Sequence, residues 1–188
     1  FGNLIFAGIF LDENRNFNLT VQKFAGFINS NVKIINISNN KNRWLVAVNE
    51  KKEIIEDEAK LVEKKQIIPI KDIFLLRKKE MMYFLKKFKK NDQDKKLSYL
   101  KKMNSIPEIN PEAKKSLLNS DYIIYGPGTQ YSSLFPSYII GNKTIKLSKA
   151  KKVMIMNLEH DNDIINLSTE KILIKNFKFL NSKFKTNS

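Results

Sequence analysis

The chain has 188 residues and a net charge of +15, and 42% of its residues are hydrophobic. It contains no cysteine, which excludes disulfides and thiolate metal sites, and its apolar runs are shorter than the roughly 20 residues of a membrane-spanning helix. Only three of its 34 basic residues are arginine, the side chain best suited to bidentate phosphate and base contacts, so nucleic acid is not the expected partner. We expect one cytoplasmic domain over residues 1–188 with no membrane partner.

The first part of the chain predicts two helices followed by three strands. Apolar residues at helical spacing mark helices over residues 2–11 and 18–28, the second with a cap near Phe17 or Asn18. Runs of β-branched and other apolar residues then predict strands over residues 32–37, 44–48 and 53–55. Because a short charged turn separates the last two strands, we expect them to form a β-hairpin.

The segment over residues 77–105 is the most basic part of the chain, with eleven basic and three acidic residues. It follows a predicted strand over residues 73–76 and holds two short stretches of apolar residues at helical spacing. These predict a pair of amphipathic helices, whose inward residues are Met81, Leu85, Phe88, Leu97, Leu100 and Met103. We interpret the pair as a basic helical insertion whose lysines face water; the alternative is a docking surface for an acidic partner or an anionic substrate.

The second half of the chain alternates helices and strands. A helix begins at Pro111, a strand covers residues 122–125, and another helix follows Ser137. The next strand covers residues 153–156, and the last helix covers residues 168–180. This alternation is typical of a mostly parallel sheet with helices on both faces, and therefore of a Rossmann-like three-layer α/β domain.

The strongest functional signal follows the strand over residues 122–125. Gly126, Pro127 and Gly128 form a glycine loop, where a ligand can approach the backbone without interference from Cβ atoms. Polar side chains come next and a helix then begins, so hydroxyls and free N–H groups gather at the end of a strand. The pattern predicts a site for a phosphate or another anion, with the further candidates Thr129, Gln130, Ser132 and Ser133. The alternative is an ordinary tight turn with Thr129 as a helix cap.

A second loop follows the strand over residues 153–156. Asn157 ends that strand, and because ligands sit at the carboxyl ends of parallel strands, we expect its loop to converge with the glycine loop. Asn157 is therefore a candidate ligand-binding residue, with an Asx turn as the alternative. The same loop holds His160, whose unperturbed pKa suits proton transfer, beside the Asp161 carboxylate. Asp161 and Asp163 are candidate ligands for Mg²⁺, and a solvated turn is the alternative.

Several stretches of the sequence resemble one protein family. The run DYIIYGPGTQYSSLFP over residues 121–136 resembles the signature of the 2-phospho-L-lactate transferase superfamily, which also includes the bacterial gluconeogenesis factors. GNLIFAGIF over residues 2–10 resembles a helix of that family, and KKVMIMNLEHDND over residues 151–163 resembles one of its strands with the following loop. The resemblance implies that Asn3 lines the same cleft. In that family a Gly-rich loop, which helps to hold nucleotide phosphates, lies upstream of this helix. This chain starts at the helix, so we expect the loop on another chain or outside the given sequence.

The resemblance implies a nucleotide-binding protein. Its leading form is a transferase that moves a phosphate-linked group, of the phospholactate type, from a nucleotide carrier to a hydroxyl acceptor, with GDP, UDP or a UDP-sugar as ligand and Mg²⁺ as cofactor. Departures from the family pattern at residues 129–131 and 157–161 imply a different substrate. One alternative is a non-catalytic regulator of carbon metabolism or of the cell envelope that binds a nucleotide sugar. The other is a polyanion-binding module built on the basic segment, and a homodimer formed through that segment is a further expectation.

Overall fold

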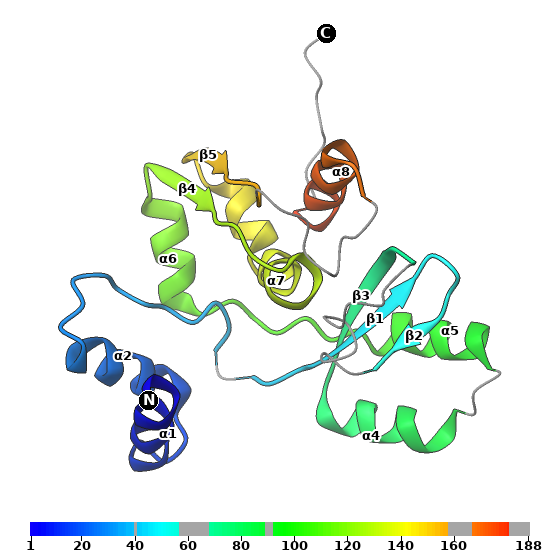
Figure 1. Cartoon of the computed structure of the whole chain (residues 1–188), viewed down its shortest axis with the longest axis horizontal. Helices are drawn as coiled ribbons and strands as arrows, with labels where there is room; N and C mark the ends of the chain where they lie inside the picture. Colours follow the sequence, from blue (N-terminus) through cyan, green and yellow to red (C-terminus); the bar gives the residue numbers. More distant parts are fainter. Residues whose placement is uncertain (40, 57–67, 89–91, 158–166, 181–188) are drawn as a thin grey trace, which may run out of the picture.

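A computed structural model describes residues 1–39, 41–56, 68–88, 92–157 and 167–180. Figure 1 shows an α/β fold with one sheet in each half of the molecule. In chain order the described elements are α1 (Gly2–Asp12), α2 (Phe17–Phe27), β1 (Trp44–Asn49), β2 (Ile54–Ile55), β3 (Ile70–Leu76), α4 (Lys78–Lys87), α5 (Gln93–Met103), α6 (Pro111–Asn119), β4 (Tyr122–Tyr125), the π-helical turn η1 (Gln130–Leu134), α7 (Phe135–Leu147), β5 (Lys151–Met154) and α8 (Thr169–Phe179).

The first sheet is antiparallel and has the strand order β2-β1-β3. β1 pairs with β2, with Val48 opposite Ile54, which confirms the predicted hairpin. On its other edge β1 pairs with β3 along its length, beginning with Trp44 opposite Leu76. Successive side chains of a strand point to opposite faces of the sheet, and most of these residues are apolar. Both faces of this sheet must therefore pack against other elements.

The helices α4 and α5 cover one face of this sheet, which confirms the helical pair predicted within residues 77–105. Leu85, predicted to point inward, is instead 49% exposed, because the neighbouring Phe84 occupies the position that faces the sheet. The N–H of Leu75 in β3 donates to the Asn104 side chain at the end of α5, at 2.9 Å. The core between sheet and helices consists of Val46, Val48, Phe74, Leu76, Met81, Phe84 and Leu100.

The second sheet consists of β4 and β5, which run parallel with Ile123 opposite Lys152. This confirms the parallel pairing that the helix–strand alternation predicts. Among the described strands, parallel pairing is confined to these two, because β1, β2 and β3 pair antiparallel. The helix α6 begins at Pro111 as predicted, and the Asn110 side chain caps it by accepting a hydrogen bond from the Glu112 N–H at 2.9 Å.

An aromatic core joins the two sheets. Phe135, the first residue of α7, stacks on Phe179 of α8 with ring centroids 4.2 Å apart, and both contact Tyr131. The Tyr131 hydroxyl donates to the Ile70 carbonyl of β3 at 2.6 Å, so η1 is tied to the antiparallel sheet. Figure 1 shows α8 between the two sheets, and Ser168 caps it as the sequence predicts. The glycine loop therefore rests on a core that both halves of the molecule share.

The N-terminal helices α1 and α2 are confirmed, and they contact each other through Phe6. Its ring centroid lies 5.7 Å from that of Phe17 and 5.5 Å from that of Phe24. The cap of α2 is Asn16, whose side chain accepts a hydrogen bond from an N–H of the first turn, and not Phe17 or Asn18. The sequence prediction was wrong here because it placed the helix start one residue too late. No described helix is long and apolar enough to cross a membrane.

The predicted strand over residues 32–37 is wrong. The described backbone in this region makes one isolated bridge, at Ser38 opposite Ile109, and the Ile37 carbonyl accepts one hydrogen bond just before α6. Val32 at the start of the segment is 69% exposed. A strand needs a neighbour that bonds along several residues, and this segment meets a partner at a single point. Its β-branched composition alone does not make it a strand.

Candidate ligand-binding site

The glycine loop, residues 126–128, leaves the carboxyl end of β4, and Asn157 follows the neighbouring strand β5. The N–H of Gly128 donates to the Asn157 Oδ1 at 2.9 Å, and the Asn157 Nδ2 donates to the Gly128 carbonyl at 3.1 Å. The two loops therefore converge, as expected for the ends of adjacent parallel strands. Two hydrogen bonds from one amide fix the position of Gly128 relative to β5.

Three hydroxyl groups gather directly after the glycine loop. The Thr129 Oγ1 lies 2.7 Å from the Ser133 Oγ, and the Ser132 hydroxyl donates to the Thr129 Oγ1 at 2.9 Å. Thr129 occupies the N-cap position of η1, but its side chain makes no capping hydrogen bond. The helix α7 begins at Phe135 and not after Ser137, because the π-helical turn runs directly into it. Hydroxyls rotate freely enough to donate to phosphate oxygens, so this hydroxyl cluster suits an anion.

Gln130 lies beneath the same turn and is 4% exposed. Its Nε2 donates to the Gly128 carbonyl at 3.4 Å, whereas its buried Oε1 has no hydrogen-bond partner. A buried acceptor without a donor costs free energy, and such groups are rare in native proteins. Gln130 therefore offers an unused acceptor next to the glycine loop, which an N–H or O–H group can satisfy.

The two glycines of the loop have different surroundings. A Cβ atom at Gly126 would meet no described atom within 4 Å, so this side of the loop is open. Gly128 has a φ of +158°, which L side chains rarely adopt, and a Cβ atom there would lie 3.5 Å from the Leu134 Cδ2. Gly128 therefore sets the path of the backbone, whereas Gly126 leaves room for a ligand.

Two buried tyrosines lie next to the loop. Tyr125 ends β4 and meets Tyr138 of α7 edge to face, with ring centroids 5.3 Å apart. Burial raises the pKa of Tyr138 to about 12 and also raises the pKa of Tyr125. Both hydroxyls are therefore protonated at neutral pH, and the two rings support the loop without serving as bases.

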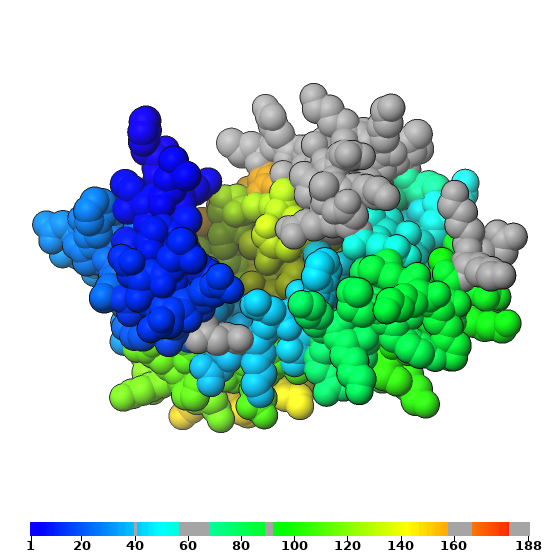
Figure 2. Space-filling model, turned by 90° about the horizontal axis from the view of Figure 1, so that it is seen from below, coloured from blue at the N-terminus to red at the C-terminus, as the bar shows by residue number. Residues whose placement is uncertain are grey.

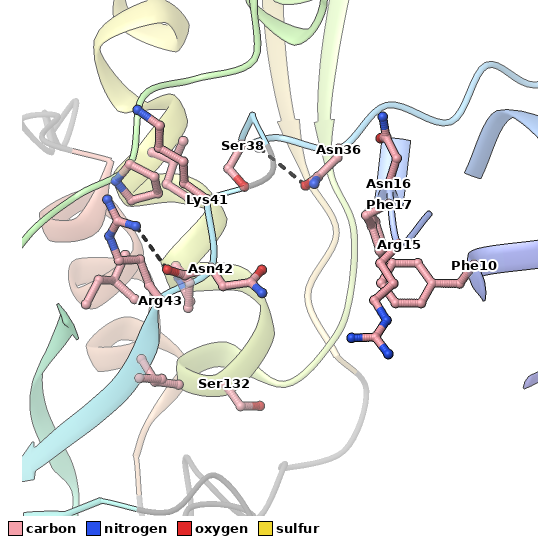
Figure 3. A pocket seen from close by; sticks show the side chains of 15 residues that line it. Phe10, Arg15, Asn16, Phe17, Asn36, Ser38, Lys41, Asn42, Arg43 and Ser132 are labelled. Carbon is pink, nitrogen blue, oxygen red and sulfur yellow. Dashed lines mark hydrogen bonds between the residues drawn. The ribbon is translucent and has the colours of Figure 1, made fainter. Parts of the chain in front are cut away.

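A cleft of about 650 Å³ lies between the N-terminal helices and α7, and it reaches the hydroxyl cluster at Ser132. In Figure 2 it is the hollow between the blue N-terminal helices and the olive residues of α7. Figure 3 shows the aromatic rings of Phe10 and Phe17 together with Arg15 on one wall. The opposite wall carries Lys41, Asn42, Arg43 and Ser132.

The cleft holds three cations, Arg15, Lys41 and Arg43, and no carboxylate is found among its described lining residues. Arg43 is held in place by its Nε, which donates to the Ser105 carbonyl at 2.7 Å. Two of the three arginines in this lysine-rich chain therefore face one cleft. The sequence prediction missed these residues, although the scarcity of arginine was a usable signal. Arginine is a better phosphate ligand than lysine, so two arginines at one cleft suit an anion.

The remaining sequence candidates are Asn3 and three residues of the loop that follows Asn157. Asn3 is exposed on α1 and is not among the residues that line the cleft. His160, Asp161 and Asp163, the candidates for acid–base chemistry and for Mg²⁺, lie outside the described residues. Within the described ranges, no three histidine, aspartate or glutamate side chains gather in a metal-binding arrangement.

Comparisons with known proteins support the fold and the family. The family model described as 2-phospho-L-lactate transferase CofD matches residues 1–173. Two crystal structures of protein BH3568 from Bacillus halodurans are similar, one with a TM-score of 0.70 at 21% identity and one, described as a member of the UPF0052 family, with 0.71 at 20%. Each match covers 95% of this chain but 49% of that chain, so this chain spans about half the length of its relative. No curated protein sequence matches.

Proposed function

The chain belongs to the family of 2-phospho-L-lactate transferase CofD, and on this basis we propose that it binds a nucleotide-linked phosphate at the glycine loop. The observation that carries the proposal is the open side of Gly126, which lies at the end of a parallel strand beside three clustered hydroxyls. Backbone without a Cβ atom lets phosphate oxygens approach closely, and the hydroxyls supply rotatable donors.

The cationic cleft extends this site. Ser132 belongs both to the hydroxyl cluster and to the lining of the cleft, so the two form one continuous surface. In the proposed complex Arg15, Lys41 and Arg43 neutralise the charge of a diphosphate. The rings of Phe10 and Phe17 offer an apolar wall for a nucleobase. A ligand with both a ring and a diphosphate, such as GDP, UDP or a UDP-sugar, matches this combination.

The proposed reaction is transfer of a phosphate-linked group from the nucleotide to a hydroxyl acceptor. In such transfers the protein contributes mainly by positioning the reactants and by stabilising charge. Here the loop and its hydroxyls would orient the phosphate, and the clamp between Asn157 and Gly128 would keep the loop rigid. The unused Gln130 Oε1 would accept a hydrogen bond from an N–H or O–H of the ligand.

Thermal denaturation with a nucleotide panel tests the binding part of this proposal. Ligand that binds only the folded state stabilises it by about 2.7 kcal/mol at a concentration of 100 times Kd, so a true ligand raises the Tm clearly. The panel contains GDP, UDP, a UDP-sugar and inorganic phosphate. Each is tested with and without Mg²⁺, because the candidate Mg²⁺ ligands Asp161 and Asp163 lie outside the described residues. If the full-length protein is folded and no nucleotide raises its Tm, the proposal is wrong.

Turnover separates the transferase from the alternative, a regulator that binds a nucleotide sugar without reacting. The ligand that gives the largest Tm shift is incubated with the protein, and the nucleotide pool is then analysed by chromatography. A transferase releases a shorter nucleotide once an acceptor is supplied, whereas a regulator returns the ligand unchanged. Either result is compatible with the binding site, so this experiment decides the reaction and not the site.

A further inference from the structure

A second groove, of about 630 Å³, lies on the helical pair α4 and α5, on the opposite side of the antiparallel sheet from the shared aromatic core. Eight described residues line it, of which four are cations, two are tyrosines and one is a carboxylate. This size falls within the range of pockets that bind small molecules or single ligand units. Neither the glycine loop nor the cationic cleft contributes to it.

The groove has an aromatic surface. The rings of Tyr83 and Tyr99 stack with centroids 5.5 Å apart and an interplanar angle of 26°. Tyr99 is held by its hydroxyl, which donates to the Glu80 carbonyl at 3.1 Å, whereas Tyr83 is 44% exposed. Tyr83 therefore rests on a fixed ring. The Lys87 Nζ lies over the Tyr83 ring, 4.9 Å from its centroid, and the remaining exposed ring surface suits contact with another planar group beside this cation.

Cations surround the tyrosines. Lys79 and Lys102 line the groove and are exposed, and Lys87 donates a hydrogen bond to the Tyr83 hydroxyl. Arg77 is the fourth cation, and its guanidinium pairs with the Glu80 Oε1 at 2.5 Å. Four positive charges face one carboxylate, so the groove attracts anions.

Glu80 distinguishes this groove from a solvated lysine surface. The residue is 8% exposed, and its second oxygen, Oε2, is buried without a hydrogen-bond partner. Burial by itself would raise the pKa of Glu80, but hydrogen bonds from its own backbone N–H and from Arg77 outweigh burial and lower it. The carboxylate is thus ionised at neutral pH and holds an unused acceptor, which repels a bare phosphate and requires an N–H or O–H donor.

We propose that this groove binds single-stranded nucleic acid, with a base stacked on Tyr83, a base N–H at Glu80, and phosphates at Lys79 and Lys102. Such a strand supplies a ring, hydrogen-bond donors and negative charge together, which is the combination that the groove requires. The scarcity of arginine argues against sequence-specific recognition of bases. Binding that does not depend on the nucleotide sequence, however, needs only lysines and an aromatic surface. The basic excess over residues 77–105 extends the electrostatic path beyond one phosphate.

The test measures binding of a fluorescent single-stranded ten-nucleotide RNA of mixed sequence by anisotropy at several salt concentrations. An abasic strand of the same length serves as the probe for charge alone. We expect the RNA to bind at least about fivefold more tightly than the abasic strand, because stacking contributes about 1–3 kcal/mol per base. Free GMP and UMP are titrated as competitors, and we expect them to displace the strand only at much higher concentrations, since each carries one phosphate.

Two exposed lysines supply the charge variant. Reversal of both, Lys79→Glu with Lys102→Glu, is expected to weaken binding by at least tenfold. It should also reduce the slope of log K against log salt by about 1.4, since each single-strand phosphate contact contributes about 0.7. The matched control is Lys114→Glu with Lys115→Glu on α6, which makes the same change in net charge at exposed positions far from the groove. Equal effects of the two double variants would overturn the proposal.

Tyr83 supplies the stacking variant. Tyr83→Ala is expected to weaken RNA binding by about 5- to 150-fold, whereas Tyr83→Phe keeps the ring and is expected to bind as the wild type does. Circular dichroism verifies that both variants are folded. Unchanged RNA affinity in Tyr83→Ala, or equal affinity for RNA and the abasic strand, contradicts the proposal. The groove does not depend on the proposed function, because Gly126 is not among its lining residues. We therefore expect Gly126→Val to leave RNA binding unchanged even if it abolishes nucleotide binding at the glycine loop.

Discussion

The surface around the glycine loop and the groove on α4 and α5 offer different groups to an anion. At the loop the available groups are hydroxyls, a buried amide and open backbone, with three cations on the two walls of the adjoining cleft. In the groove, four cations and two tyrosines surround a buried carboxylate. The loop suits close, directional contacts with one phosphate, whereas the groove suits stacking and longer-range attraction. The distribution of charge in the sequence therefore points to the groove on α4 and α5, but it gives no indication of the surface around the glycine loop.

The largest expected effect concerns the core that joins the two regions. Phe135 is 1% exposed and stacks on Phe179, so Phe135→Ala is expected to cost about 3–5 kcal/mol of unfolding free energy. Phe84→Ala, equally buried in the core under the groove, is the matched variant. Urea denaturation is followed by the fluorescence of Trp44, the sole tryptophan, and by circular dichroism. If the fluorescence and circular dichroism transitions coincide in each variant, the two regions unfold as one unit. Separate transitions of the two probes would show that the regions are energetically independent.

Removal of the clamp on the glycine loop is expected to act on binding more than on stability. Asn157→Ala loses both hydrogen bonds to Gly128, and we expect nucleotide affinity to fall by about tenfold, since hydrogen bonds of this kind contribute about 0.5–1.5 kcal/mol each. Asn157→Asp keeps the acceptor and is expected to lose less. Calorimetric titration with the preferred nucleotide measures both. RNA binding by the groove should be unaffected, and a parallel loss there would contradict the separation of the two surfaces.

The cationic cleft can be tested without loss of stability. Arg15 has a φ of +62°, a left-handed conformation that costs an arginine roughly 1–2 kcal/mol and a glycine almost nothing. Arg15→Gly is therefore expected to preserve or raise the Tm and to weaken nucleotide binding by several-fold through the loss of a cation. Arg15→Lys is the control that retains the charge. Unchanged affinity in Arg15→Gly would remove this wall of the cleft from the proposed site.

The smallest expected effect is a pH dependence near the shared core. Burial lowers the pKa of Lys175 below its ordinary value of 10.5, and its Nζ donates to the Ile70 carbonyl at 2.5 Å. The folded state therefore releases this proton at lower pH than the unfolded chain does. The stability of the wild type relative to Lys175→Met should then rise as the pH increases through the folded pKa toward 10.5. Urea denaturation of both proteins between pH 7 and pH 10 measures this, and a constant difference would contradict the burial of the charge.

Features with a local sequence signal were predictable. The start of α6 at Pro111 and the cap of α8 at Ser168 are set by side chains within one helical turn, and both are observed. The hairpin and the parallel pair β4–β5 also follow from short patterns. The segment over residues 32–37 shows the limit of such patterns, since a β-branched composition cannot indicate whether a neighbouring strand is present.

The sequence identifies the glycine loop as a candidate anion site, but it does not show what surrounds the loop. The contact between Asn157 and Gly128 follows from strand order, so it could be expected. Arg15 and Arg43 come from separate segments, one in the turn after α1 and one before β1, and their spacing in the sequence does not show that they meet. The same holds for Glu80, whose unused oxygen depends on how α4 and α5 pack on the sheet.

The most direct test of the central claim is calorimetric titration of the full-length protein and of Gly126→Val with GDP, UDP and a UDP-sugar. Among the described glycines only Gly128 has a positive φ, and a side chain at Gly126 meets no described atom within 4 Å, so the variant is expected to fold normally. We predict that the wild type binds a nucleotide and that a valine side chain at this open position abolishes binding while the Tm in the absence of ligand stays unchanged. Nucleotide binding of equal affinity by the folded variant would contradict the assignment of the phosphate to the glycine loop.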